Sequence, residues 1–170
     1  MTTPASTPPV VTMHIWGVRN RAVPGALWRM ATDRSRVRRS HGLRFAKLLG
    51  TGSGETFSLR DADPHHWGLI AVWDDVADAR VFELGSLVTT WDHHCYEKAR
   101  FVLSTIHSRG SWSGREPFGP GAKPPVAGPV AAITRAKIKP SQWRRFASEV
   151  PPVAADSASA AGLLLSTGIG

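Results

Sequence analysis

The feature that most constrains the fold is a repeat within the sequence. Shifted by 116 positions, the distance from Arg19 to Arg135, the sequence matches itself without a gap. Self-similarity at a fixed shift indicates a structural unit built twice. Chance similarity between two short βαβ stretches is the alternative, and the shared glycine-rich corner argues against it. The matching pairs are Arg19 and Arg135, Pro24 and Pro140, Arg29 and Arg145, Ala31 and Ala147, Val37 and Val153, Leu48 and Leu164, Leu49 and Leu165, Thr51 and Thr167, Gly52 and Gly168, and Gly54 and Gly170.

The first copy has the pattern of a ferredoxin-like unit. Stretches rich in β-branched and apolar residues predict strands, and Pro24 is placed where the first turn of a helix tolerates proline. Apolar residues on both faces of the third strand indicate that both faces are covered. The order β-α-β-β-α-β is the ferredoxin-like order. The expected elements are strands over 10–18, 43–50, 65–75 and 99–112, a helix from Pro24, and a helical region over about 76–98 that is interrupted near Gly85.

These patterns predict an α+β protein of tandem ferredoxin-like repeats, with the second repeat truncated. The second copy would hold two strands and one helix, and it would have to pack against the first copy to bury its sheet face. The expected segments are a flexible N-terminal lead over 1–9, a first repeat over 10–112, a linker rich in proline and glycine over 113–128, and a partial second repeat over 129–170.

The net charge of +8 is concentrated in one segment, Arg29–Arg44, which holds six arginines. A solvated helix face is the simplest interpretation. Anionic lipid headgroups and nucleic-acid phosphates are the functional alternatives. Nucleic acid is the less favoured partner, because no aromatic residues alternate with these charges. The segment therefore predicts a possible peripheral contact with a membrane.

The remaining composition points to a globular protein in a reducing compartment. Hydrophobic residues make up 42% of the chain, which includes seven tryptophans. No apolar run reaches the ~18 residues that a membrane span needs. The N-terminus lacks the features of a secretory signal. The single cysteine, Cys95, excludes an intramolecular disulfide. We therefore expect a cytoplasmic protein, with association at a membrane surface as the alternative.

The stretch FAKLLGTGSGETF over 45–57 is a glycine-rich corner and not a phosphate site. A P-loop requires lysine and a hydroxyl residue after its last glycine, and this chain has Glu55 instead. A dinucleotide fingerprint fails because Glu55 also occupies the place of its third glycine. The stretch therefore predicts a turn that links two strands.

Three segments together carry a resemblance to a known family. FAKLLGTGSGETF, HSRGSWSGREPFGP and GPVAAITRAKIKPSQWRRF resemble the spheroidene monooxygenase family of carotenoid biosynthesis, and the resemblance covers about 10–170. It implies a fold of the dimeric α+β barrel type, in which two ferredoxin-like units pack sheet to sheet. It also implies oxygenation of an acyclic carotenoid near its end group with O2. Haem as cofactor and an electron donor such as ferredoxin are implied in the same way.

If the protein uses haem, the stretch WDHHCY over 91–96 offers ligands for the iron. His94 is the expected ligand, with His93 behind it and Cys95 as a further candidate. An equally good interpretation is that His94 is a buried histidine that only forms a hydrogen bond with a carbonyl group. His14 and His107 are candidates for acid or base groups inside the barrel, whereas His41 and the pair His65 and His66 are expected in solvent or a loop.

A polyene substrate requires a lining of aromatic and aliphatic side chains. Trp16 and Trp91 are the expected lining residues, with His107 and Arg109 at the exit of the fourth strand. The alternative is that the tryptophans are simply core residues. The main rival function is a non-enzymatic module of the same fold that binds haem or a hydrophobic ligand. A nucleic-acid-binding surface is a third possibility.

Overall fold

The computed structural model describes residues 9–52, 61–119, 121, 128–135, 139–142 and 160–170. The strands within this part form one antiparallel sheet in the order β4-β1-β3-β2-β5. The four long strands have the order of a ferredoxin-like sheet, so the predicted α+β architecture of the first unit is confirmed. The described elements are β1 (Val10–Val18), η1 (Asn20–Ala22), α1 (Val23–Arg38), β2 (Leu43–Gly52), β3 (Ala62–Trp73), α2 (Val76–Glu83), α3 (Ser86–His94), β4 (Cys95–Ser104), η3 (Pro140–Gln142) and β5 (Gly168–Ile169).

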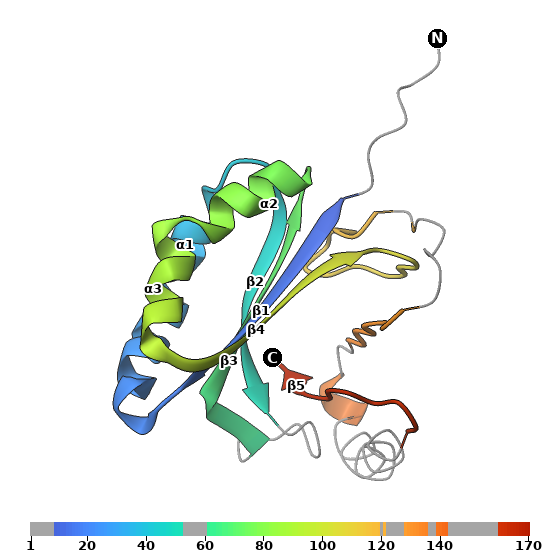
Figure 1. Ribbon diagram of the computed structural model, residues 1–170. Coiled ribbons are helices and arrows are strands. Elements are labelled where there is room, and N and C mark those ends of the chain that lie inside the picture. Colours follow the sequence, from blue (N-terminus) through green and yellow to red (C-terminus); the bar gives the residue numbers. More distant parts are fainter. Residues whose placement is uncertain (1–8, 53–60, 120, 122–127, 136–138, 143–159) are drawn as a thin grey trace.

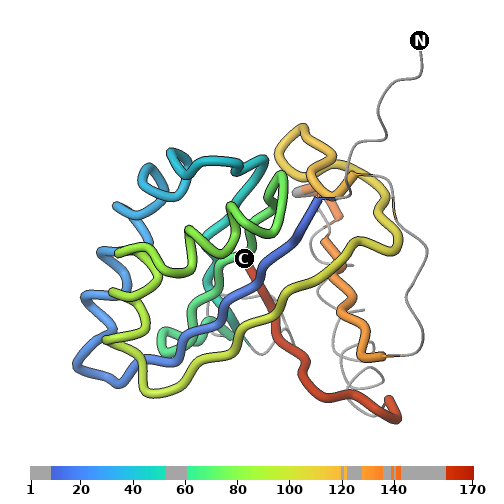
Figure 2. The backbone as a smooth tube through the Cα atoms, turned by 45° about the horizontal axis from the view of Figure 1, so that its top comes forward, coloured from blue at the N-terminus to red at the C-terminus, as the bar shows by residue number. Residues whose placement is uncertain are grey.

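Helices α1, α2 and α3 cover one face of the sheet (Figure 1). The main core lies between these helices and the sheet, and a smaller apolar cluster lies on the opposite face. Strand β3 contributes to both, since Leu69 and Trp73 pack toward the helices while Ile70 and Val72 belong to the opposite cluster. The prediction that both faces of this strand are covered is therefore confirmed. Figure 2 shows the described C-terminal segments, in orange and red, away from the helices.

The predicted start of the first helix and the predicted break near Gly85 are confirmed, and one predicted boundary is wrong. Pro24 lies in the first turn of α1. Asp75 caps α2 by accepting hydrogen bonds from the backbone N–H groups of Ala77 and Asp78. Gly85 separates α2 from α3, as expected. The exception is the stretch after His94, where the predicted helix is wrong, because Cys95 already begins β4 and pairs with β1.

Strand β4 also ends earlier than predicted, at Ser104 instead of about residue 112. Its partner explains the difference, because Ser104 pairs with Val10, which is the first residue of β1. Beyond that point β1 offers no backbone groups to continue the ladder. The chain then turns at Gly110, whose φ of 87° favours glycine, and forms an isolated bridge between Trp112 and Arg115.

The second repeat stays a prediction. Residues 128–135 form no strand, although a strand is expected there, and the expected helix from Pro140 lies mostly outside the described residues. The described part of its second strand is β5, which pairs antiparallel with the end of β2. Gly52 pairs with Gly168, and the predicted repeat would make these two glycines equivalent positions. The two glycine corners therefore meet each other along one sheet edge. The expected turn between β2 and β3 falls on 53–60, outside the described residues.

Candidate functional site

An open, shallow cavity of about 600 Å³ lies where β1 ends and η1 begins. Its lining joins three parts of the chain that are far apart in sequence: the end of β1 with η1, the start of β3, and the start of β4. Polar groups and one aromatic ring therefore converge on a single hollow that is open to solvent. The lining residues are Val18, Arg19, Asn20, Arg21, His65 and Tyr96.

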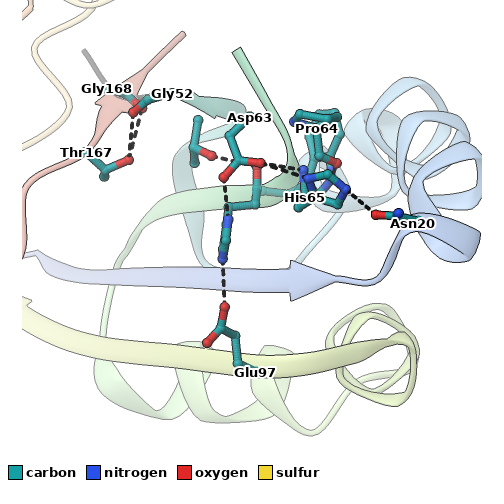
Figure 3. Close-up of polar contacts among 11 residues, drawn as sticks. Asn20, Gly52, Asp63, Pro64, His65, Glu97, Thr167 and Gly168 are labelled. Carbon is teal, nitrogen blue, oxygen red and sulfur yellow. Dashed lines mark hydrogen bonds and ion pairs between the residues drawn. The ribbon is translucent and has the colours of Figure 1, made fainter. Parts of the chain in front are cut away.

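The polar side chains beside this cavity are held by a network of hydrogen bonds (Figure 3). The Nε2 atom of His65 lies 2.7 Å from Asn20 Oδ1. The backbone N–H of His65 donates a hydrogen bond to Asp63 Oδ1 at 2.8 Å. The neighbouring His66 bridges two carboxylates, with Nδ1 2.5 Å from Asp63 Oδ2 and Nε2 2.7 Å from Glu97 Oε1. The network ties the start of β3 to β4 and to η1.

Gly17 of β1 makes the bridge between β3 and β4 possible. It pairs with His66 on one side and with Glu97 on the other, so the bridge crosses over it. A Cβ atom at this position would lie 2.6 Å from Glu97 Cγ, which is closer than side-chain carbons approach. A glycine inside a strand rich in β-branched residues therefore marks the place where another side chain passes close to the backbone.

The charges in this network support one another. Partial burial opposes the charge of His66, but its hydrogen bonds to Glu97 and Asp63 outweigh burial and raise its pKa. Partial burial likewise opposes ionisation of Asp63, and its hydrogen bond with His66 nevertheless keeps its pKa below the usual range. The His66 bond lowers the pKa of Glu97 as well. The two carboxylates therefore favour the protonated form of His66.

A second cluster lies on the other face of the sheet, under the helices. The rings of Trp16 and Trp91 stack at 5.1 Å, and both side chains are fully buried. Each indole N–H donates to a carboxylate, that of Trp16 to Asp92 at 2.8 Å and that of Trp91 to Asp33 at 3.1 Å. The two predicted lining residues are therefore brought together. Their role toward a substrate stays a prediction, because in this arrangement they are core residues.

His14 stacks on Trp16 and lacks a hydrogen bond. Its ring lies 5.2 Å from that of Trp16, and the side chain is 1% exposed. Neither ring nitrogen has a hydrogen-bond partner, and Glu83 Oε1 lies 3.5 Å from Nε2. Burial lowers the pKa of His14 to about 4, and Arg100 adds to this effect while Asp92 opposes it. His14 is therefore neutral at pH 7.

The structure places the expected haem ligands at the surface. His93 and His94 are exposed at the end of α3, and His94 Nδ1 lies 2.8 Å from the carbonyl oxygen of Thr90 in the same helix. Cys95 begins β4, and its thiol donates to the carbonyl oxygen of Asp92. The two described cavities, of about 600 and 390 Å³, are lined by neither histidine. The described residues therefore do not fit a haem held by His94.

The two other predicted substrate residues follow β4. His107 and Arg109 are exposed in irregular chain, because the strand ends at Ser104. The expectation that His107 points from a strand into a barrel interior is therefore wrong. Trp112 instead packs on the opposite sheet face against Phe45, with ring centroids 5.4 Å apart. Among the described residues, no cluster of three or more His, Cys, Asp or Glu side chains is arranged to hold a metal ion.

Comparison with known proteins identifies relatives of the chain. Spheroidene monooxygenase from Rubrivivax gelatinosus is 39% identical over 130 residues, which are 76% of this chain and 50% of that protein. Spheroidene monooxygenase from Rhodobacter capsulatus is 32% identical over 152 residues, or 88% of this chain and 63% of that protein. The chain is related to the spheroidene monooxygenases. The resemblance that the sequence motifs indicate is thus confirmed.

The chain spans about half the length of the first of these spheroidene monooxygenases and 63% of the second. No family model matches the chain. Among solved structures, an antibiotic biosynthesis monooxygenase is 14% identical, with a TM-score of 0.45, and the match covers 58% of this chain and 99% of that one. A fold similarity at this level carries no argument about activity.

Proposed function

We propose that the protein oxygenates an acyclic carotenoid with O2, close to one end group. The observation that supports this proposal is the sequence identity of 39% and 32% with two spheroidene monooxygenases. In such a monooxygenation, one oxygen atom is inserted into a C–H bond and the other leaves as water. The two electrons come from a reduced donor, for which we propose a protein of the ferredoxin class, and the two protons come from solvent.

The cavity at the end of β1 is our candidate for the place that receives the end group. The His65 ring is held at both nitrogens, since Nε2 lies 2.7 Å from Asn20 Oδ1 and Nδ1 lies 3.3 Å from Asp63 Oδ1, so the ring has one defined orientation at the cavity wall. The Arg19 guanidinium lies 5.4 Å from the centre of the Tyr96 ring, which holds that ring against the end of β1. Fixed polar groups beside an aromatic surface can orient the end of a long apolar molecule.

Turnover tests this proposal directly. The protein is incubated in air with an acyclic carotenoid in detergent micelles and with reduced ferredoxin, and the products are measured by mass spectrometry. We expect a product one oxygen atom heavier than the substrate, and a rate at least about tenfold lower for His65→Ala, because a displaced end group loses its orientation. His107→Ala is the matched control, since His107 is exposed outside the cavity. Binding without turnover would favour the non-enzymatic alternative.

Haem stays a proposal that rests on the resemblance, and its ligand can be tested separately. His94 is exposed and already engaged with its own helix. We therefore expect that adding haem to the His94→Ala variant gives the same Soret absorbance as adding it to the unchanged protein. His93→Ala serves as the neighbouring control. Loss of the Soret band in His94→Ala alone would restore His94 as the iron ligand.

A further inference from the structure

Helix α1 presents an unusual outer face to solvent. Its inner positions, Ala26, Met30, Asp33 and Val37, are buried. The exposed positions recur every three or four residues, as expected for one face of a helix. We define the outer stripe of α1 by these residues: Pro24, Leu27, Trp28, Ala31, Arg34, Ser35 and Arg38. Its first half is apolar and its second half is basic.

The apolar half exposes large side chains to water. Trp28 is 70% exposed and Leu27 is 53% exposed. Neither is needed to fill the core, since the buried positions of α1 already pack against the sheet and α3. A tryptophan beside a leucine on an exposed helix is the composition of helices that lie in the headgroup region of a bilayer.

The basic half carries charge that no carboxylate compensates. Among the described residues, neither Arg34 nor Arg38 forms a salt bridge, and the same holds for Arg39 just beyond the helix. The one acidic residue of α1 is Asp33, which is buried and accepts hydrogen bonds from Arg36 and from Trp91. The charged groups on the exposed surface of α1 are therefore all cationic, in contrast to ordinary surface helices that pair opposite charges.

We infer that the outer stripe of α1 docks on an anionic lipid bilayer. Arginines attract the negative surface of such a bilayer, and the side chains of Leu27 and Trp28 enter its headgroup region. Nucleic acid fits less well, because its phosphates would meet the arginines but leave the apolar half without a partner. α1 follows directly after η1, which lines the cavity, so docking brings the cavity near the bilayer. The use of that position for a lipophilic substrate rests on the proposed function, whereas the lipid contact does not.

Vesicle flotation tests this inference without any assay of turnover. Vesicles of phosphatidylcholine alone are compared with vesicles that also contain phosphatidylglycerol, at low and high salt. We expect binding to the anionic vesicles only, weakened by salt. The double variant Arg34→Gln/Arg38→Gln should bind about 30-fold less tightly. Trp28→Ser should bind about tenfold less tightly, while Trp28→Phe should retain binding.

A matched control and a fold check accompany these variants. Leu164→Ser removes a leucine that is even more exposed than Trp28, 85% against 70%, from a segment that lies away from the helices, and it should leave binding unchanged. Unchanged circular dichroism spectra show that the variants are folded. Equal binding to neutral and anionic vesicles would overturn the inference. Unchanged binding of both Arg34→Gln/Arg38→Gln and Trp28→Ser to anionic vesicles would overturn it too. Tighter binding to duplex DNA than to anionic vesicles would overturn it as well.

Discussion

Truncation of Trp16 to alanine should lower the free energy of unfolding by about 4 kcal/mol. Trp16 is fully buried and stacks on Trp91 on one side and on His14 on the other. The change removes these contacts and opens a cavity under the helices. Asp92 also loses the hydrogen bond that it accepts from the indole N–H. Urea denaturation followed by circular dichroism measures the loss.

Trp16→Phe is the matched control for this prediction. It keeps an aromatic ring in the stack and loses mainly the hydrogen bond to Asp92, so we expect a loss of about 1 kcal/mol. The contrast between the two variants separates packing from hydrogen bonding. A loss below about 1 kcal/mol for Trp16→Ala would mean that Trp16 is not a core residue, and would favour its predicted role as lining of a substrate site.

Replacement of His14 by leucine should make the protein less sensitive to acid. Burial lowers the pKa of His14 from 6.5 to about 4 in the folded protein. Between these values the unfolded chain binds the proton more readily than the folded protein does. Above pH 6.5 His14 therefore does not reduce the free energy of unfolding. As the pH falls from 6.5 through about 4, protonation of the unfolded chain lowers the free energy of unfolding.

The size of this effect follows from the shift in pKa. At pH 4 the penalty on the unchanged protein is about 3 kcal/mol, and His14→Leu should escape it. At pH 7 the variant should differ by only about 1 kcal/mol, because it loses the stack on Trp16 but also removes two unpaired ring nitrogens. Other titrating groups cancel when the two proteins are compared at each pH. The prediction would be contradicted if the free energy of unfolding of His14→Leu and of the unchanged protein changed with pH in parallel.

His66 should act in the opposite direction, which makes it the natural comparison for His14. Its pKa is raised by Glu97 and Asp63 in spite of partial burial. Its contribution to stability is therefore present below pH 6.5 and is lost as the pH rises through the raised pKa of the folded protein. Two histidines on opposite faces of one sheet thus shift the pH of maximum stability in opposite directions.

The ferredoxin-like unit could be predicted from the sequence because its patterns are local. β1 is rich in β-branched residues, and the alternation of Leu69 and Trp73 with Ile70 and Val72 identifies both faces of β3. The boundary between α3 and β4 is different. Its position depends on which residues can pair with β1, so the helical pattern runs on past Cys95 although the backbone does not.

The polar cluster beside the cavity was beyond sequence reasoning for a similar reason. Glu97 and His66 are 31 residues apart, and only the order of the strands brings them to the two sides of Gly17. The one local signal is Gly17 itself, a glycine within a predicted strand. His14 was a candidate from its residue type, but its burial and its lack of a partner appear only once the helices are packed on the sheet.

Isotopic labelling of the oxygen tests the central claim most directly. The protein is supplied with an acyclic carotenoid, a reduced ferredoxin and O2 that carries a heavy isotope, and the product is analysed by mass spectrometry. The proposed monooxygenation predicts one labelled oxygen atom in the carotenoid product and one in water. Unlabelled product from labelled O2, or a carotenoid that binds and is recovered unchanged, would contradict it.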